Sequence, residues 1–480
     1  MRASGVPVCD ALLNLQSSTL NASVLAIIKR LFPSWNSVEV ADLTVSRISG
    51  ALTNCVFVVS HSLDVSSPVP QMDNSTNCIP VNSSLNTDNH VTRNSDNLTS
   101  LNNDDLAPHS NQLLLRVYGA SSDAFIHRHR ELYWITKLSS MGIGPRLLGA
   151  FQNGRFEQFL PSITLRKTHL RDPTFMHLIA SEMACIHLMV EEEARLERVE
   201  KKLRIATVGT APAADELTDS SDTMECIPPE CIPPLSTEVS ASTTDLLKGD
   251  DIPSLTSPEE EELGAYDAMQ GEMQSELWET LDKWHALAEK SLSKLLATLP
   301  QTHPHYSTLS SLNLPQLKQE INHLRQHLAA NFPSPIVFSH NDTQYGNLLF
   351  TDDNRLIIVD YEYASLNYRG FDIGDHWMEW CADYHGPHPE DMDWSKYPDL
   401  SARTSWATSY LAASKNIPPS AVDIASVKAL VNEADAYAVV THIFWGLWGI
   451  IQATGSQIEF DYLRYARNRI DEYRRVSSTL

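Results

Sequence analysis

Hydrophobic positions follow the pattern of strands through much of the first 160 residues. VEVADLTVSRISGALTNCVFVVS predicts two strands around a glycine-containing turn, and QLLLRVYGA predicts a third, short apolar strand. LLGAFQNGRFEQFL predicts a hairpin with its turn at Asn153-Gly154. Two helices are predicted as well. The first is an amphipathic stretch ending in SVLAIIKRLFPSW, and the second, SSDAFIHRHRELYWITKLSSMGIG, begins at a Ser/Asp cap and ends at Gly142 and Gly144.

Helical patterns dominate the rest of the chain, except for one strand pair near Phe350. The longest apolar run, Ala438 to Ala453, carries Thr441 and His442. It is shorter than the roughly 20 residues that a membrane-spanning helix needs. We therefore expect a buried helix there, and no transmembrane segment.

Two segments interrupt these patterns. The first, about 61–111, is rich in Asn, Ser and Asp, and the second, about 205–264, contains the near-repeat ECIPPECIPP and an EEEE cluster. Such compositions bury too little apolar surface to offset the entropy lost on ordering. We expect two disordered insertions, one in an N-terminal part (1–160) and one in a C-terminal part (161–480).

The net charge of −24 over 480 residues excludes the basic stripes by which proteins bind nucleic acid. Much of this acidity belongs to the second insertion, which has fourteen acids and one Lys between Asp215 and Glu262. Seven cysteines scattered over a long chain favour a reducing compartment over a disulfide framework. The N-terminus also lacks the apolar region of a secretory signal, so we expect a cytoplasmic protein.

The segment Val337–Trp380 carries the chemistry. Asp342 and Asn347 reproduce the D-x-x-x-x-N spacing of the kinase catalytic loop, and Asp360 ends the strand pair that follows. Asp and Asn are also common in turns, and a lone match would indicate a turn. Phosphoryl transfer from ATP needs a carboxylate near the attacking hydroxyl and oxygen ligands for Mg²⁺. Asp342 fits the first role, and Asn347 and Asp360 fit the second.

An upstream pair agrees with this interpretation. Arg116 lies on the strand where a kinase places its phosphate-contacting cation, and Glu131 follows fifteen residues later on the next helix. Alone, such a pair would indicate only a surface ion pair. Together with the catalytic loop it predicts a phosphate clamp.

The motifs resemble those of the choline/ethanolamine kinase family. They are ISGALTN, LLLRVYG, GRFEQFLPS, HNDTQYGN, VDYEYASLNYRGFDIGDHWMEW and FWGLWGIIQA, in that order along the chain. The resemblance implies an α+β, bilobal, protein-kinase-like fold with a small strand-rich N-terminal lobe and a larger, mainly helical C-terminal lobe. It also implies transfer of the ATP γ-phosphate to a small amino-alcohol, with choline preferred and some activity on ethanolamine.

The resemblance also assigns residues to the nucleotide. With Arg116 and Glu131, the implied nucleotide-binding residues are Gly50, Thr53, Asn54, Gln158, Phe159, Leu160 and Gln344. Asp342 becomes the base, and Asn347 and Asp360 become the Mg²⁺ ligands. One departure is Ala51, because the family turn commonly carries paired glycines and Ala restricts positive φ.

Aromatic residues carry the substrate hypothesis. Trp445 and Trp448 share one helical face, and aromatic faces are what holds a quaternary ammonium best. Without the resemblance, such residues would indicate a core. With it, the implied choline pocket comprises Tyr363, Glu379, Tyr384, Trp445, Trp448, Phe460 and Tyr465.

Three alternatives remain open from the sequence. The chain could be an ethanolamine kinase, a relative that phosphorylates another alcohol such as an aminoglycoside, or a catalytically silent scaffold. Intact Asp342, Asn347 and Asp360 argue against a silent scaffold. Members of the family are often dimers, so the resemblance also allows a homodimer.

Overall fold

The computed structural model of the chain describes residues 6–48, 54–62, 111–119, 128–189, 274–456 and 458–478. All of them belong to one compact unit, which comprises Met1–Val190 and Gln274–Leu480. The second predicted insertion lies outside the described residues, and so does nearly all of the first. The predicted boundary at residue 160 stays a prediction.

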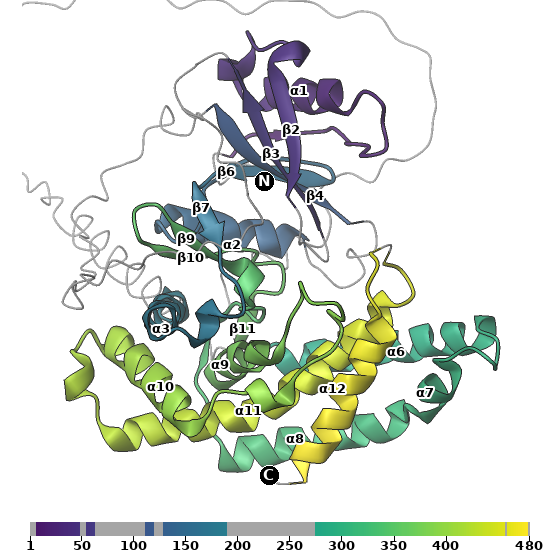
Figure 1. Cartoon of the computed structure of the whole chain (residues 1–480), viewed down its shortest axis with the longest axis vertical. Helices are drawn as coiled ribbons and strands as arrows, with labels where there is room; N and C mark the ends of the chain where they lie inside the picture. Colours follow the sequence, from purple (N-terminus) through teal and green to yellow (C-terminus); the bar gives the residue numbers. More distant parts are fainter. Residues whose placement is uncertain are drawn as a thin grey trace, which may run out of the picture. The chain divides into compact units, whose positions relative to one another are not determined.

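The N-terminal part contains a mixed sheet with the strand order β1-β5-β6-β4-β3-β2 (Figure 1). Only β1 and β5 pair in parallel among these strands. The elements are β1 (Val8–Cys9), α1 (Leu20–Leu31), β2 (Leu43–Ile48), β3 (Asn54–His61), β4 (Gln112–Tyr118), α2 (Arg128–Ser140), β5 (Leu147–Phe151) and β6 (Gly154–Gln158). Leu113, Leu115 and Val117 alternate along β4, so they share one face and pack with α1 in a buried core. The predicted strands and both predicted helices in this part are confirmed, but the Ser/Asp cap predicted to begin the second helix and the predicted turn around Gly50 lie outside the described residues.

The predicted turn of the β5–β6 hairpin is displaced by one residue. Phe151 pairs with Gly154, so the turn residues are Gln152 and Asn153. Asn153 binds the backbone of Leu13 through both ends of its amide, at 2.9 and 2.8 Å. A Cβ on Gly154 would come within 2.5 Å of the Arg116 carbonyl oxygen, so this glycine serves close strand pairing and not the turn.

The strand pair near Phe350 is confirmed as β9 (Leu348–Thr351) and β10 (Leu356–Ile358). The expectation of a single pair after residue 160 is wrong. β7 (Ser162–Thr164) extends the pair, and β8 (Ile336–Ser339) and β11 (Ser365–Tyr368) form a separate two-stranded sheet. These strands are three or four residues long, which is too short to show a periodic pattern.

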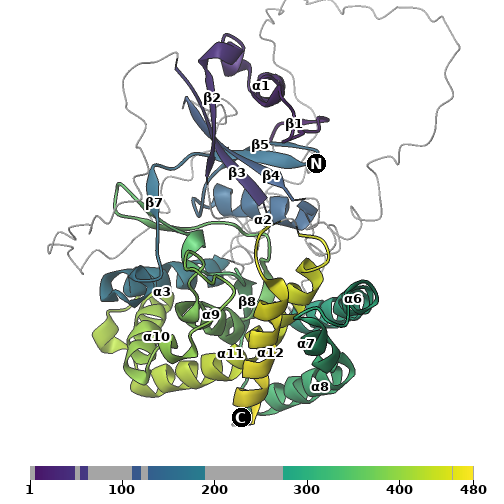
Figure 2. The ribbon, with the colours of Figure 1, turned by 45° about the vertical axis from the view of Figure 1, so that its right-hand side comes forward.

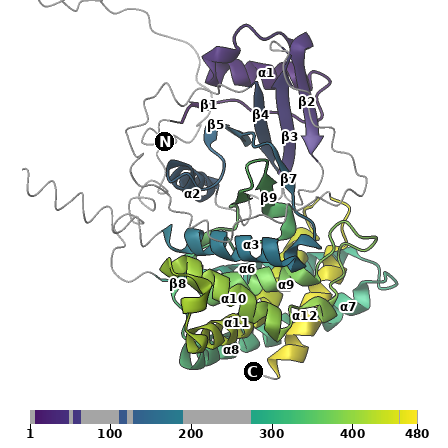
Figure 3. The same cartoon turned by 60° about the vertical axis from the view of Figure 1, so that its left-hand side comes forward.

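The helical part is built around α11 (Ile424–Gln452), against which α9, α12 and α6 pack (Figure 2). Figure 3 shows α3 lying alongside α10, as their contacts also indicate. The other helices are α3 (Pro173–His187), α6 (Leu277–Thr298), α7 (Tyr306–Ser311), α8 (Leu314–Asn331), α9 (Arg369–Met378), α10 (Leu400–Lys415) and α12 (Tyr462–Ser477).

The apolar run predicted to form a buried helix is the C-terminal half of α11, and its residues from Ala436 to Gln452 are all buried. Among the described residues, α11 is long and apolar enough to cross a membrane, and 94% of its most apolar window is buried inside the molecule. A helix that is apolar all round is typical of a protein core as well as of a membrane span.

Candidate active site

The loop between β8 and β9 is held in place by Asp372 of α9. The backbone N–H groups of His340 and Asn341 donate to its two carboxylate oxygens at 2.8 and 2.7 Å. His187 of α3 forms a third hydrogen bond to the same carboxylate, at 2.8 Å. Asn341 has a φ of 63°, in the left-handed region that Asn tolerates better than most residues. One fully buried acid thus fixes the start of the loop.

Asp342 and Asn347 lie side by side, as their spacing predicted. The amide Nδ2 of Asn347 donates to the Asp342 carboxylate and to the Asp342 carbonyl oxygen, both at 2.9 Å. A short 3-10 helix, Tyr345–Asn347, folds the loop back to make this contact. Because Nδ2 is bonded to Asp342, the carbonyl oxygen is the ligand atom that Asn347 can offer a metal.

Asp360 follows β10 with a φ of 72°. Its Oδ2 pairs with the Arg116 guanidinium at 2.8 Å, and its Oδ1 is buried without a hydrogen-bond partner. Burial is the largest single influence and opposes ionisation, but the charges of Arg116 and Arg155 and the hydrogen bond from Arg116 together lower the pKa of Asp360. His340 joins the two halves of the site, because its Nε2 donates to the Val359 carbonyl at 2.9 Å.

Oxygen atoms suited to a divalent cation gather around Asp360. Carboxylate oxygens of Glu131, Asp360 and Glu362 lie within 4.8 Å of one another. Hard oxygen ligands are those that Mg²⁺ prefers, and the unpartnered Oδ1 of Asp360 is a buried acceptor in need of a cation or donor. The residues present therefore fit Mg²⁺. Sequence reasoning missed Glu362, although it stands only two residues after Asp360.

The predicted direct pairing of Arg116 with Glu131 is wrong. Arg116 pairs with Asp360 and, at 3.5 Å, with Glu157 of β6. Glu131 pairs instead with Arg155 of β6 at 2.7 Å and with Arg128 at 3.0 Å. Sequence reasoning missed Arg155 and Glu157. The available signal was two opposite charges on either side of Phe156 in a predicted strand, and because this strand is buried the charges must be paired.

The remaining nucleotide assignments stay predictions. Gly50 and Thr53 lie outside the described residues, as does Ala51. Asn54 is the first residue of β3 and pairs with Tyr118 of β4. Gln344 accepts a hydrogen bond from Gly346 N at 3.0 Å and so begins the 3-10 helix of the loop.

The predicted adenine-facing segment connects β6 with β7. Gln158 ends β6 and pairs with Leu113, while Phe159 and Leu160 are partly exposed. The Leu160 carbonyl accepts a hydrogen bond from Ser162 Oγ at 2.9 Å. These bonds fix the backbone of the segment, as contact with an adenine ring would require.

Two tryptophans of α11 are fixed by buried partners. Trp445 Nε1 donates to Asp375 Oδ1 at 2.7 Å, and Trp448 Nε1 donates to the Tyr363 hydroxyl at 2.8 Å. The ring of Trp445 lies edge to face with Trp448 at 5.5 Å and with Tyr363 at 5.3 Å between centroids. Asp375 was missed by sequence reasoning, although it precedes the predicted Glu379 by one helical turn.

The rest of the predicted pocket surrounds Glu379. Tyr384 donates to Glu379 at 2.7 Å, and Arg469 of α12 donates to it at 3.2 Å and to the Tyr465 hydroxyl at 3.1 Å. The Phe460 ring lies 5.6 Å from that of Tyr465. Sequence reasoning missed Arg469, whose signal was its position four residues after Tyr465 on the apolar face of a helix.

Acidic residues beside the aromatic cluster influence the ionisation of Asp342 in the catalytic loop. Burial, and after it the charges of Glu379, Asp375, Asp360 and Glu362, raise the pKa of Asp342 well above its usual range. Hydrogen bonds also connect the loop with the predicted alcohol pocket, because Asn341 Nδ2 donates to the Tyr363 carbonyl at 2.8 Å and Tyr384 N donates to the Tyr345 hydroxyl at 2.6 Å. A bound cation would stabilise the ionised acids of this cluster.

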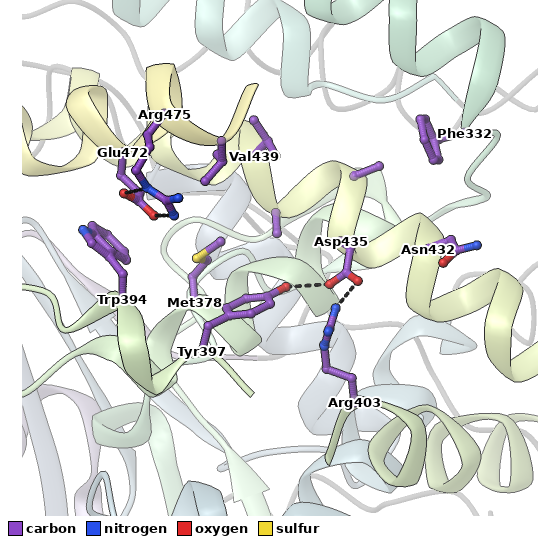
Figure 4. Close-up of a pocket in the computed structure, with 13 residues that line it drawn as sticks. Phe332, Met378, Trp394, Tyr397, Arg403, Asn432, Asp435, Val439, Glu472 and Arg475 are labelled. Atoms are coloured by element: carbon purple, nitrogen blue, oxygen red, sulfur yellow. Dashed lines mark hydrogen bonds and ion pairs between the residues drawn. The ribbon is translucent and has the colours of Figure 1, made fainter. Parts of the chain in front are cut away.

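A cavity of about 490 Å³ lies elsewhere, between α11, α12 and the segment 394–403 (Figure 4). Met378, Trp394, Tyr397 and Val439 are among its lining residues, and none of the predicted site residues lines it. The functional interpretation therefore depends on the polar loop and the aromatic cluster and not on this cavity.

Comparisons with known proteins identify similar sequences and a similar fold. The profile of the choline/ethanolamine kinase family matches residues 45–474. "Probable choline kinase 2" of Arabidopsis thaliana is 29% identical over 76% of this chain and 77% of its own length. "Probable ethanolamine kinase" of the same plant is 27% identical over 94% and 84%. The solved structure of a Plasmodium vivax ethanolamine kinase has a TM-score of 0.59 at 18% identity, covering 97% of this chain and 92% of its own.

Proposed function

The chain belongs to the choline/ethanolamine kinase family of ATP-dependent phosphotransferases, and we propose that choline is its preferred acceptor and phosphocholine its product. The observation that carries this proposal is the hydrogen bonding of the aromatic cluster. The polar edges of Trp445, Trp448 and Tyr384 are already bonded to Asp375, Tyr363 and Glu379. Such a cluster offers a ligand π faces, which suit a quaternary ammonium that has no N–H to donate.

Negative charge near the faces supports a cationic acceptor. Asp375 and Glu379 are buried beside the aromatic rings, and Arg469 partly balances them. Burial, and after it the charge of Glu379, raise the pKa of Asp375 well above its usual range, so a trimethylammonium group bound nearby would favour its ionised form. Choline has no N–H to donate, and binding to the π faces of this cluster requires none.

In the proposed mechanism, Asp342 orients the alcohol and accepts its hydroxyl proton as the γ-phosphate is transferred in line. Asn347 holds the Asp342 carboxylate in place through its amide. Asn347 and Asp360 would hold Mg²⁺, which would neutralise part of the charge on the phosphates. Arg116, anchored by Asp360, would contact the phosphates. No covalent enzyme intermediate is needed.

Ethanolamine kinase activity is the second candidate. The relatives include proteins named for either alcohol, and the carboxylates of Asp375 and Glu379 could accept hydrogen bonds from a primary ammonium. We therefore expect some activity on ethanolamine alongside that on choline.

Steady-state kinetics with each alcohol test the proposal. We expect kcat/KM to be higher for choline, and a tenfold advantage of ethanolamine would overturn the preference. Asp342→Asn should lower kcat about 10²- to 10⁴-fold with MgATP and choline. Full activity of this variant would show that Asp342 is not the base, and a wild type inactive on both alcohols would favour a silent scaffold.

A further inference from the structure

Ion pairs of alternating sign connect α2 with Asp360. In order along this row, the residues are Arg128, Glu131, Arg155, Glu157, Arg116 and Asp360, and successive members are 3.0, 2.7, 2.5, 3.5 and 2.8 Å apart. Arg128 also lies 3.6 Å from Glu362, two residues beyond Asp360. Arg128, at one end of the row, thus lies near the proposed metal ligand Asp360 at the other end.

Arg155 is the central cation of this row. Its side chain is completely buried, and it contacts Glu131 of α2 and Glu157 of its own strand. The Tyr118 ring lies 5.6 Å from its guanidinium, and the Tyr118 hydroxyl lies 3.5 Å from NH1. Both carboxylates are also almost fully buried, so each depends on protein cations for its charge balance.

Glu157 is shared between two arginines. Its Oε1 lies 2.5 Å from Arg155 Nε and 3.5 Å from Arg116 Nε. Arg155 is therefore its main partner, and Arg116 directs its shorter contact to Asp360. If Arg155 were removed, Glu157 would have Arg116 as its remaining arginine and would compete with Asp360 and with any phosphate for it.

We propose that Arg155 is a positioning residue for phosphoryl transfer, which satisfies Glu131 and Glu157 and thereby leaves Arg116 to Asp360 and the ATP phosphates. This inference rests on the proposed role of Arg116 in binding phosphate. In protein kinases a direct lysine–glutamate pair joins the third strand to the following helix. Here the same two elements, β4 and α2, are joined through Arg155 and Glu157.

Calorimetric titration with MgATP, in the absence of any alcohol, tests the proposal. Arg155→Met keeps an unbranched apolar stem and removes the charge, and we expect its MgATP affinity to fall at least about tenfold. Adding Glu157→Gln removes the carboxylate that would compete for Arg116. We expect this double variant to bind MgATP at least about threefold more tightly than Arg155→Met. A merely structural role of Arg155 would not produce this recovery.

Arg469→Met provides the matched control, because Arg469 is equally buried but lies beside the alcohol pocket. It should raise KM for choline and leave MgATP affinity within about twofold. MgATP affinity of Arg155→Met within about twofold of the wild type would overturn the proposal, as would a double variant weaker than Arg155→Met.

Thermal unfolding reports whether each variant is folded. If Arg155→Met shows no cooperative transition, Arg155→Lys decides, since it keeps the charge and loses the forked geometry. If Arg155→Lys binds MgATP at least about threefold more weakly than the wild type, the proposal is supported. If it binds MgATP with wild-type affinity, the proposal is overturned. Because no alcohol is present, a failure of the choline assignment would leave this readout intact.

Discussion

Asp342, the proposed base, lies in surroundings that oppose its ionisation. Burial and four neighbouring acids raise its pKa well above the usual range. In its protonated form it cannot accept the proton of an alcohol. Each cation bound nearby, whether Mg²⁺ or the ammonium of the acceptor, favours the carboxylate. Binding of the substrates therefore prepares the base.

The pH dependence of the reaction should reflect this coupling. The acid limb of kcat/KM for choline reports the enzyme before choline binds, and that of kcat reports the ternary complex. Because bound choline lowers the pKa of Asp342, we expect the acid limb of kcat to lie at lower pH than that of kcat/KM. Rate profiles at saturating MgATP measure both limbs. Coincident limbs would contradict the prediction.

Trp445 should determine selectivity between the two alcohols. Its indole faces the cluster and is fixed by Asp375, so Trp445→Ala removes a π face that a quaternary ammonium needs. A desolvated cation–π contact contributes about 2 kcal/mol, so kcat/KM for choline should fall at least about tenfold more than that for ethanolamine.

Trp406→Phe is the control for this variant. Trp406 is also fully buried and packs on Tyr410, away from the predicted pocket. It should lower thermal stability and leave the ratio of the two kcat/KM values unchanged. Equal losses for both alcohols in Trp445→Ala would show that Trp445 acts through packing alone.

At the scale of elements, α9 and α3 together hold the catalytic loop. Asp372 in the first turn of α9 accepts two backbone N–H groups of the loop and a hydrogen bond from His187 of α3. Asp372→Ala would leave these buried donors unpaired, at about 1–3 kcal/mol each. We expect a loss of at least about 3 kcal/mol in the free energy of unfolding and a large fall in kcat. Chemical denaturation and steady-state kinetics measure the two effects.

A second acid at the start of a helix provides a control that distinguishes loss of stability from displacement of the loop. Asp399 caps α10 by accepting from Ala402 N at 2.8 Å and is exposed. Asp399→Ala should cost about 1 kcal/mol and leave kcat unchanged. If Asp372→Ala lost stability but kept kcat, the helix would not position the loop.

The sequence predicted local features better than those that depend on residues far apart in the chain. The spacing of Asp342, Asn347 and Asp360 is local and predicted a site that the fold assembles. The partners Asp375 and Arg469 contact residues 70 and 90 positions away, so their local helical spacing did not show what they bind. Strands of three or four residues were missed for a related reason, because long-range pairing and not local periodicity defines them.

At the scale of the whole molecule, the charge of −24 is unevenly distributed. Fourteen acids and one Lys fall between Asp215 and Glu262, in the segment predicted to be an insertion, so this segment carries −13 and the rest of the chain −11. ATP is an anion, so an acidic segment opposes its approach through a long-range field. Salt screens that field over about 8 Å at physiological ionic strength.

Removal of residues 205–264 tests whether this charge matters to catalysis. The site residues all lie elsewhere in the chain, so kcat should stay within about twofold of the full-length value. At about 0.15 M salt the KM for MgATP should also be unchanged, since the field is screened. At about 0.01 M salt, where screening extends to roughly 30 Å, the full chain should show the higher KM. Steady-state titrations at both salt concentrations measure the difference. A fall in kcat on deletion would contradict the prediction that this charge plays no part in the chemical step.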